Sequence, residues 1–202
     1  MKKTRIAVFV SGGGTNLQAL IDAQLRGEIP HGEIALVVSD QPGAYALTRA
    51  ENHGIASALV GKKNYPVLAE RIEALHAVLD AHQIDMIVLA GYLGIVQPQT
   101  VEKFDGRIIN IHPSLIPSFC GMGFYGLHVH EAALARGVKV TGATVHLVTA
   151  GVDEGPILLQ KAVEILDGDT PEVLQRRVME QAEWVLLPRA AEMIAKQIAD
   201  KE

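Results

Sequence analysis

The stretch IAVFVSGGGTNLQAL, residues 6–20, decides the fold. Its first five residues are all apolar, which predicts a strand buried on both faces, and the run stops at Ser11 and three glycines. From Leu17 onward apolar residues recur at helical spacing until Gly27 ends the segment. A strand, a glycine-rich turn and a helix in this order are typical of the first unit of an open α/β sheet.

The following residues repeat this rhythm of short apolar runs and helical segments. A short helix is predicted to end near Gly54, and a longer one over 66–82 has a single apolar stripe, made of Leu68, Ile72, Leu75 and Leu79. Buried strands are predicted over 34–38, 55–60, 85–90 and 107–111. Strands that alternate with helices favour a parallel sheet with helices on both faces.

The C-terminal part shows a different pattern. After a helix over 130–136, alternation over 140–148 and 156–165 predicts a pair of antiparallel strands. A final helix follows, with Asp169 or Thr170 as its cap, and Pro188 is expected to kink or restart it. The predicted fold is therefore α/β: a Rossmann-like open, mostly parallel sheet with an antiparallel C-terminal extension.

Composition narrows the classes of partner. The 202 residues include 49% hydrophobic ones and carry a net charge of −5, and no basic run marks a nucleic-acid binder. No apolar stretch is long enough for a membrane span or a signal peptide, and Cys120 has no second cysteine to pair with. We expect a cytoplasmic protein with small-molecule partners, a monomer or a homodimer, folded as one domain over 1–202 with a phosphate-binding half over about 1–100.

The glycine turn is a candidate phosphate site. Its spacing, Gly12-x-Gly14-x-x-Leu17, lacks the third glycine of a dinucleotide fingerprint, and no Gly-Lys-Ser/Thr follows. The turn could be a tight connection without a ligand. Thr15 and Asn16 favour binding instead, because both side chains can donate to phosphate oxygens beside a helix N-terminus.

The stretch IINIHPSLIP, residues 108–117, carries the strongest chemical signal. Asn110 and His112 are two apart on a predicted strand, so their side chains emerge on one face. An amide N–H and an imidazolium at one point suit a reaction in which a carbonyl oxygen becomes negative, as in acyl transfer. An apposed carboxylate would raise the pKa of the histidine, and Asp153 and Glu154 are equal candidates by position.

Two other chemistries are weaker alternatives. His128 and His130, at strand spacing, could bind a metal with His146 or Cys120, but no close cluster of carboxylates or cysteines completes a ligand set. Ser114 has no Gly-x-Ser-x-Gly motif around it, so a hydrolase nucleophile is disfavoured. We predict no metal site.

Taken together, the motifs resemble those of the phosphoribosylglycinamide formyltransferases, a family of folate-dependent enzymes of purine synthesis. The resemblance runs end to end, over five motifs in compatible order: residues 10–18 (VSGGGTNLQ), 89–92 (LAGY), 110–117 (NIHPSLIP), 142–146 (GATVH) and 153–156 (DEGP). It implies that an amine of glycinamide ribonucleotide attacks the formyl carbon of 10-formyltetrahydrofolate, with catalytic and folate-binding residues in the half over about 101–202.

The resemblance also implies roles for individual residues. Asn110 would hold the formyl oxygen, His112 would be a protonated donor, and Asp153 would pair with His112 and relay a proton. The implied acceptor-binding residues, from the phosphate to the ribose, are Gly14, Thr15, Asn16, Ile111, Pro113 and Glu183. The implied donor-binding residues, around the pterin ring, are Leu93, Gly94, Ile95, Val96 and Asn110.

Three departures from the family pattern concern the folate. Gly94 stands where many relatives carry arginine, and the segment 65–68 lacks an arginine often found there. Lys62 or Lys63 could replace it at the glutamate tail, although lysine lacks the fork of arginine. The segment 119–126 is longer than in some relatives, and its glycines predict a mobile cover over the site.

Three other functions compete with this one. Formyltetrahydrofolate hydrolase and methionyl-tRNA formyltransferase use a similar strand but usually carry an additional domain, so the length disfavours both. A phospholigand-binding module of the same fold would have no need for Asn110, His112 and Asp153 together.

Overall fold

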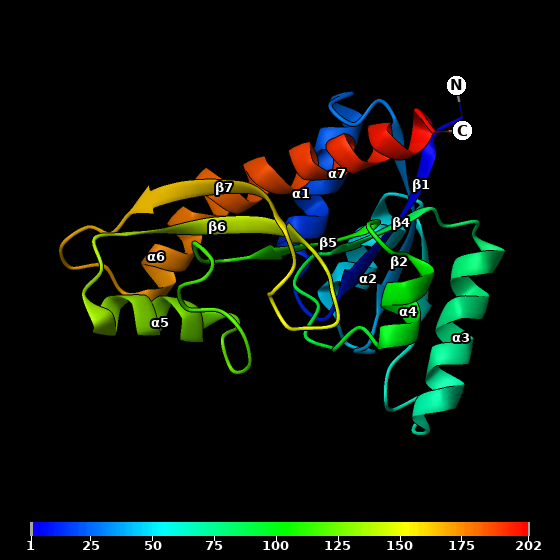
Figure 1. The fold of residues 1–202 in the computed structure, drawn as a ribbon, viewed down its shortest axis with the longest axis horizontal. Helices are drawn as coiled ribbons and strands as arrows, with labels where there is room; N and C mark the ends of the chain where they lie inside the picture. The colour runs from blue at the N-terminus through cyan, green and yellow to red at the C-terminus, as the bar shows by residue number, and fades with distance from the viewer. Residues whose placement is uncertain (1, 202) are drawn as a thin grey trace.

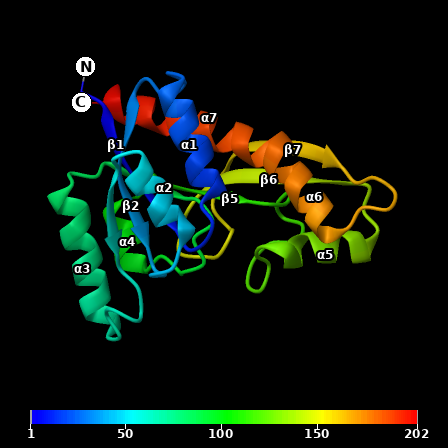
Figure 2. The same ribbon diagram turned by 180° about the vertical axis from the view of Figure 1, so that it is seen from behind.

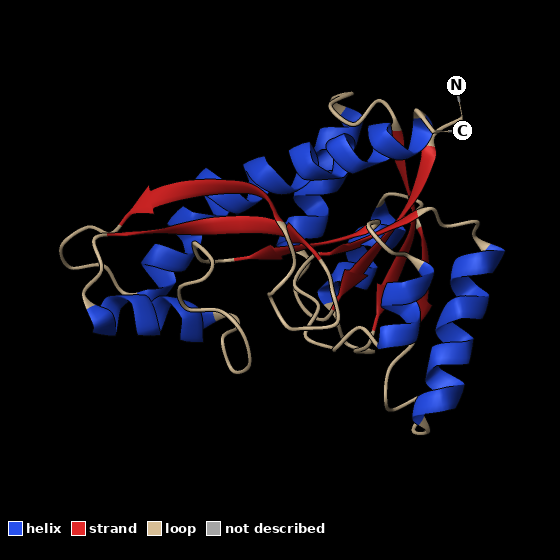
Figure 3. Ribbon diagram, viewed as in Figure 1, coloured by secondary structure: helices blue, strands red, loops and turns tan. Residues whose placement is uncertain are grey.

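The computed structural model describes residues 2–201, so the two ends of the predicted domain, Met1 and Glu202, lie outside the described residues. Within this part, one sheet has the strand order β3-β2-β1-β4-β5-β6-β7 (Figures 1 and 3). The strands are β1 (Thr4–Val10), β2 (Gly32–Ser39), β3 (Ala56–Leu59), β4 (Met86–Leu89), β5 (Ile108–His112), β6 (Val140–Leu147) and β7 (Ile157–Glu164).

Strands β1 to β5 are parallel, and β6 and β7 are antiparallel to their neighbours. The predicted mostly parallel sheet with an antiparallel C-terminal extension is confirmed. The chain runs from β1 outward to β3 and then crosses to β4 on the other side of β1. Such a reversal of strand order leaves a crevice at the carboxyl ends of the strands, where open α/β sheets bind ligands.

Helices cover both faces of the sheet (Figure 2). Those with ordinary α geometry are α1 (Thr15–Leu25), α2 (Tyr45–Asn52), α3 (Leu68–Ala81), α4 (Pro98–Lys103), α5 (Leu127–Arg136), α6 (Pro171–Val178) and α7 (Trp184–Ala199). The hydroxyl of Thr170 accepts a hydrogen bond from the N–H of Val173, so Thr170 rather than Asp169 caps α6.

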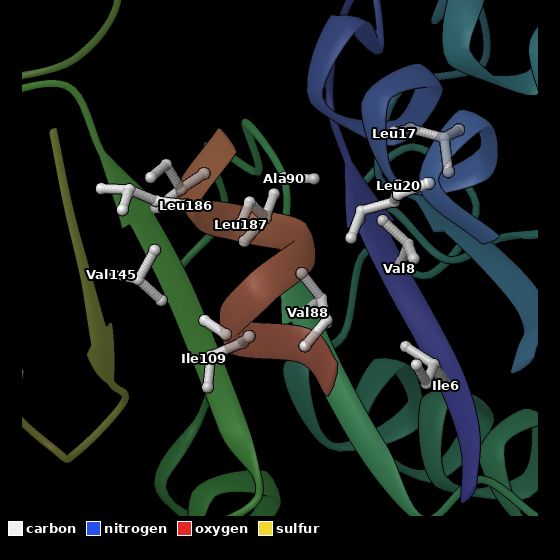
Figure 4. Packing of buried hydrophobic residues seen from close by; sticks show 14 of the residues in the cluster. Ile6, Val8, Leu17, Leu20, Val88, Ala90, Ile109, Val145, Leu186 and Leu187 are labelled. Atoms are coloured by element: carbon white, nitrogen blue, oxygen red, sulfur yellow. The ribbon is translucent and has the colours of Figure 1, made fainter. Parts of the chain in front are cut away.

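The sheet separates two hydrophobic clusters, as expected for a strand buried on both faces. Ile6 and Val8 of β1 pack with Leu17 and Leu20 of α1 and with the strands and α7 shown in Figure 4. Phe9 belongs to the cluster on the opposite face, with α3 and α4. Successive side chains of a strand point to opposite faces, which explains this division.

Three details differ from the sequence-based expectations. The helix α4 was not predicted, because six residues are too few to show an apolar period. The predicted apolar stripe of α3 is buried only toward its end: Leu79 is fully buried, whereas Leu68 is 45% exposed. The C-terminal helix departs from α geometry in a π turn over Met179–Glu183, before Pro188 rather than at it.

The π turn contains one buried acidic side chain. A wider turn adds one residue to the local repeat. Ala182 and Glu183, which are adjacent in the sequence, are both buried there. The carboxyl group of Glu183 therefore lies inside the protein rather than on its surface.

The start of β1 and the end of α7 meet at the amino ends of the parallel strands, on the side of the sheet away from the crevice. The hydroxyl of Thr4 donates to the carbonyl of Ala195 at 2.8 Å, and Figures 1 and 2 both show the start of β1 beside the end of α7. Among the described residues, no helix is both long and apolar enough to cross a membrane.

Candidate active site

A cavity of about 570 Å³ opens at the carboxyl ends of the parallel strands. Its walls come from the segments around the ends of β4 and β5, from two later loops, and from Asn16 of α1 and Glu183 of the π turn. The lining residues are Asn16, 91–96, 110–113, 121–126, 148–153 and Glu183, together with a few neighbours. The predicted catalytic and donor-binding residues therefore line one cavity.

An amide, two imidazoles and a carboxylate meet on one side of this cavity. Asn110 Nδ2 lies 3.1 Å from His146 Nε2 and 3.4 Å from Asp153 Oδ1. Asp153 Oδ2 lies 3.5 Å from His112 Nδ1. His146 Nδ1 donates to the carbonyl of Leu147 at 2.8 Å, which leaves Nε2 to accept from Asn110. The predicted trio is thus assembled from residues up to 43 positions apart.

The hydrogen bonds of His112 define which of its nitrogens exchanges a proton. Nε2 lies 2.8 Å from the carbonyl of Phe119, and a carbonyl only accepts, so Nε2 carries the hydrogen. Nδ1 then faces Asp153 and is the atom that gains the second proton. Burial lowers the pKa of His112, and the contributions of Phe119 and Asp153, which raise it, do not compensate. Burial therefore disfavours the protonated form of His112 in this arrangement, and its role as a protonated donor stays a prediction.

Asp153 is held as an ionised carboxylate. Burial alone raises its pKa, but the neighbouring His146, the hydrogen bond from the N–H of Gly121 and the nearby His112 bring the pKa below the ordinary value. Its backbone has a φ of 57°, in the left-handed region that aspartate and asparagine tolerate better than most residues. Glu154 is exposed, so the geometry resolves the alternative in favour of Asp153.

The glycine turn presents free N–H groups at the start of α1. Gly14 adopts the left-handed conformation, with a φ of 71°, and a Cβ there would lie 2.6 Å from that of Ala46. No side chain caps α1. Within residues 2–201 no acceptor is found for the N–H groups of Thr15 and Asn16. A turn of this kind suits an anion.

Asn16, which follows the glycine turn, and Glu183, which lies in the π turn, are in contact although they are 167 positions apart in the sequence. Asn16 Nδ2 donates to Glu183 Oε2 at 2.6 Å, and Asn16 Oδ1, although buried, has no partner. Burial raises the pKa of Glu183 to about 7, against the opposing effect of the Asn16 hydrogen bond. Both side chains line the cavity. Thr15 contacts Met179 of the cavity wall but itself borders a smaller hollow.

Glu183→Gln is expected to stabilise the protein at pH 8 but not at pH 5. The folded-state pKa of Glu183, about 7, lies above that of the unfolded chain, so ionisation lowers the free energy of unfolding as the pH rises through this range. Glutamine avoids this cost, which reaches about 3 kcal/mol. Urea unfolding at both pH values measures it, with Glu180→Gln, at an exposed position of the same turn, as control. A gain independent of pH would contradict the interpretation.

The predicted donor-binding segment lies at the cavity mouth. Leu93 and Ile95 are about 60% exposed, and the N–H of Leu93 is held by the hydroxyl of Ser11 at 2.8 Å. A Cβ at Gly94 would lie 2.6 Å from the ring of Tyr92, so Tyr92 fills the space beside the glycine. Lys62 and Lys63 are not among the described residues that line the cavity, whereas 121–126 does line it.

The metal alternative is wrong in its geometry. His128 and His130 lie on α5, not on a strand, where a separation of two points them to different sides: His128 is exposed and His130 is buried. The described residues contain no group of three or more potential ligands. Ser114 donates to the carbonyl of Ser118, which gives it no partner that would activate it.

His146 is the site residue that the sequence reasoning missed as a functional group. It is buried and contacts both Asn110 and Asp153. The sequence indicated only that His146 lies on a predicted strand over 140–148. The pairing of β5 with β6, which sets His146 opposite Asn110, reveals the contact.

An open α/β sheet with an amide, an imidazole and a carboxylate at its crevice suits group-transfer chemistry. The model of the formyl transferase family matches residues 4–190. This match spans most of the chain, which belongs to the formyl transferase family.

Individual relatives agree with this assignment. The chain is 42% identical, over 96% of its length, to the trifunctional purine biosynthetic protein adenosine-3 of Homo sapiens, but spans only 18% of that protein. It is 42% identical to the phosphoribosylglycinamide formyltransferase of Haemophilus influenzae, covering 93% of this chain and 84% of the relative. A crystal structure of glycinamide ribonucleotide transformylase 1 from Symbiobacterium toebii superposes with a TM-score of 0.89 at 44% identity, covering 96% and 89% of the two chains.

Proposed function

We propose that the protein is a phosphoribosylglycinamide formyltransferase of purine synthesis, which transfers the formyl group of 10-formyltetrahydrofolate to the amine of glycinamide ribonucleotide. One observation carries the proposal: Asn110, His112 and Asp153 line a cavity that is also lined by Asn16, which directly follows the uncapped glycine turn at the start of α1. The phosphate of a phosphorylated amine would bind at the glycine turn, and the carbonyl group of a donor would lie beside Asn110 and His112. The names of the relatives support the same reaction.

The acceptor is assigned to the end of the cavity near α1. Its phosphate would accept hydrogen bonds from the N–H groups at Gly14, Thr15 and Asn16, where the helix dipole also favours an anion. Glu183 and the unpartnered Oδ1 of Asn16 are both acceptors, and they suit the hydroxyl groups of a ribose. The backbone at Ile111 and Pro113 then directs the amine toward the catalytic trio.

The donor is assigned to the mouth of the cavity. Apart from the Leu93 N–H, which Ser11 holds, the backbone of 93–96 would offer the N–H and carbonyl groups that a flat heterocycle such as a pterin requires, between the apolar side chains of Leu93 and Ile95. The loop over 148–153 forms the facing wall. The formyl group would then lie beside Asn110 and His112.

The reaction forms a bond from the amine nitrogen to the formyl carbon and breaks the bond from that carbon to N10 of the folate. Negative charge develops on the formyl oxygen in the tetrahedral intermediate, where the amide of Asn110 and the imidazole of His112 stabilise it. The proton lost by the amine passes by way of the Asp153 carboxylate and His112 to N10. Because burial disfavours the charged form of His112, a positive charge on this side chain gains most from the oxyanion beside it, which favours the transition state over the ground state.

Both catalytic donors must change partners when the substrates bind. Asn110 directs its amide hydrogens to His146 and Asp153, and His112 directs Nε2–H to the carbonyl of Phe119. The formyl oxygen would replace one acceptor of each.

We further propose that 1–202 is a single cytoplasmic formyltransferase domain without nucleic-acid or membrane partners, in line with its composition.

The proposal predicts release of tetrahydrofolate from 10-formyltetrahydrofolate only when a phosphorylated acceptor is present. Stopped-flow absorbance would compare glycinamide ribonucleotide, its phosphate-free riboside and no acceptor, and we expect kcat/KM to fall by about 100-fold without the phosphate, as charge-assisted contacts are lost. Equal release without acceptor would instead identify a hydrolase. No release in any arm would identify a binding module.

A further inference from the structure

Helix α2 holds the carbonyl groups of the glycine turn. The N–H of Ala46 donates to the carbonyl of Gly12 at 3.1 Å, and Arg49 Nε donates to the carbonyl of Gly13 at 2.8 Å. In a planar trans peptide the N–H points opposite to the carbonyl. Fixing these two carbonyls toward α2 therefore turns the N–H groups of Gly13 and Gly14 away from it.

Arg49 is itself fixed in place. Its Nη1 donates to Gln18 Oε1 at 3.0 Å, and its guanidinium lies 5.0 Å from the centre of the Tyr45 ring. Gln18 belongs to α1 and Tyr45 to α2, so the side chain spans the gap between the two helices. Such a stacked and forked guanidinium keeps its position better than a lysine would.

The charge of Arg49 is not neutralised by an acidic side chain. Across residues 2–201, no carboxylate forms an ion pair with it. Arg26, at the other end of α1, pairs with Glu28 at 2.7 Å. A fixed and uncompensated positive charge beside free N–H groups raises the affinity of that place for an anion.

A second observation places a ligand at this turn. Asn16, two residues beyond Gly14, is 7% exposed and its Oδ1 has no partner. Buried polar atoms without partners are rare, and one that lines a cavity indicates a missing hydrogen-bond donor. A phosphorylated sugar supplies both the anion for the turn and a hydroxyl for Asn16.

We propose that Arg49 is the positioning residue of the phosphate subsite. It fixes the Gly13 carbonyl so that the following N–H faces the phosphate, and it adds a positive charge to the subsite. The identity of the acceptor in this inference rests on the proposed function, but the phosphate subsite does not. The sequence alone gave no sign of it, because Arg49 lies in a helix 36 positions after Gly13.

The kinetic test compares Arg49→Met and Arg49→Lys with Arg26→Met as the matched control. For Arg49→Met we expect KM for the phosphorylated acceptor to rise by about 10- to 100-fold, with kcat changed by less than about threefold. The preference for this acceptor over its riboside should fall by the same factor. Arg49→Lys should recover part of the loss, because it keeps the charge but not the fork. Arg26→Met should match the wild type.

Calorimetric titration with inorganic phosphate tests the subsite without any turnover. The wild type and Arg26→Met should bind phosphate with equal Kd, and Arg49→Met should bind it about tenfold or more weakly. Equal binding by Arg49→Met, or equal losses with both acceptors, would overturn the inference. Should the wild type bind phosphate through Arg49 yet transfer no formyl group, the proposed function would fail while the subsite stands.

Discussion

Asp153→Asn is expected to lower kcat by about 10²- to 10⁴-fold, the range for loss of a group in proton transfer. Asparagine has the same shape, and it tolerates the left-handed backbone at this position, so the loop should keep its course. The negative charge is lost, however. The carboxylate is, after the Phe119 carbonyl, the second group that raises the pKa of His112 against burial, so that pKa falls further and the positive charge on His112 becomes harder to form.

The matched control for this prediction is Glu154→Gln. Glu154 is the neighbouring acidic residue and is exposed, so the same change of charge there should leave kcat within about twofold of the wild type. Steady-state kinetics across pH 5.5 to 9 with saturating substrates measures both variants, and circular dichroism confirms that they are folded. Turnover by Asp153→Asn at the wild-type rate would remove Asp153 from the mechanism.

His112→Ala is expected to lower the single-turnover rate of formyl transfer by about 10²- to 10³-fold, the effect of losing one donor to an oxyanion. Binding of the phosphorylated acceptor should change much less, because the phosphate is assigned to the glycine turn at the start of α1, whereas His112 contacts Phe119 and Asp153. Rapid quench of a single turnover measures the first quantity, and calorimetric titration measures the second.

The control here is His128→Ala on α5. That side chain is 59% exposed, and it pairs with Glu131 rather than with the catalytic trio. It should leave both quantities unchanged. If His112→Ala weakened acceptor binding while the single-turnover rate stayed normal, His112 would be a binding residue and not a catalytic one.

Much of the architecture could be predicted because the signals are local. The run over 6–10 and the turn after it specify β1 and the start of α1, and alternation over 140–148 specifies β6. The two-residue spacing of Asn110 and His112 similarly predicts a shared face at the end of β5. Each of these inferences depends on neighbours within a few positions.

The remaining features depend on contacts between distant segments. The pKa of His112 depends on its burial and on the carbonyl of Phe119, and the environment of Glu183 depends on Asn16, 167 positions earlier. The support of Asn110 by His146 requires the register of β5 against β6. The π turn has no sequence pattern of its own, since it differs from an α turn by one residue.

The meeting of β1 and α7, where Thr4 bonds to Ala195, also bears on how this domain can be combined with others. The cavity opens at the carboxyl ends of the parallel strands, whereas the amino end of β1 lies at their other ends, with the end of α7 beside it (Figure 1). A linker joined to either end would leave the entrance to the cavity open. The fold can therefore be inserted into a longer polypeptide, or fused at either side, as an interchangeable module whose substrates still reach it from the free side.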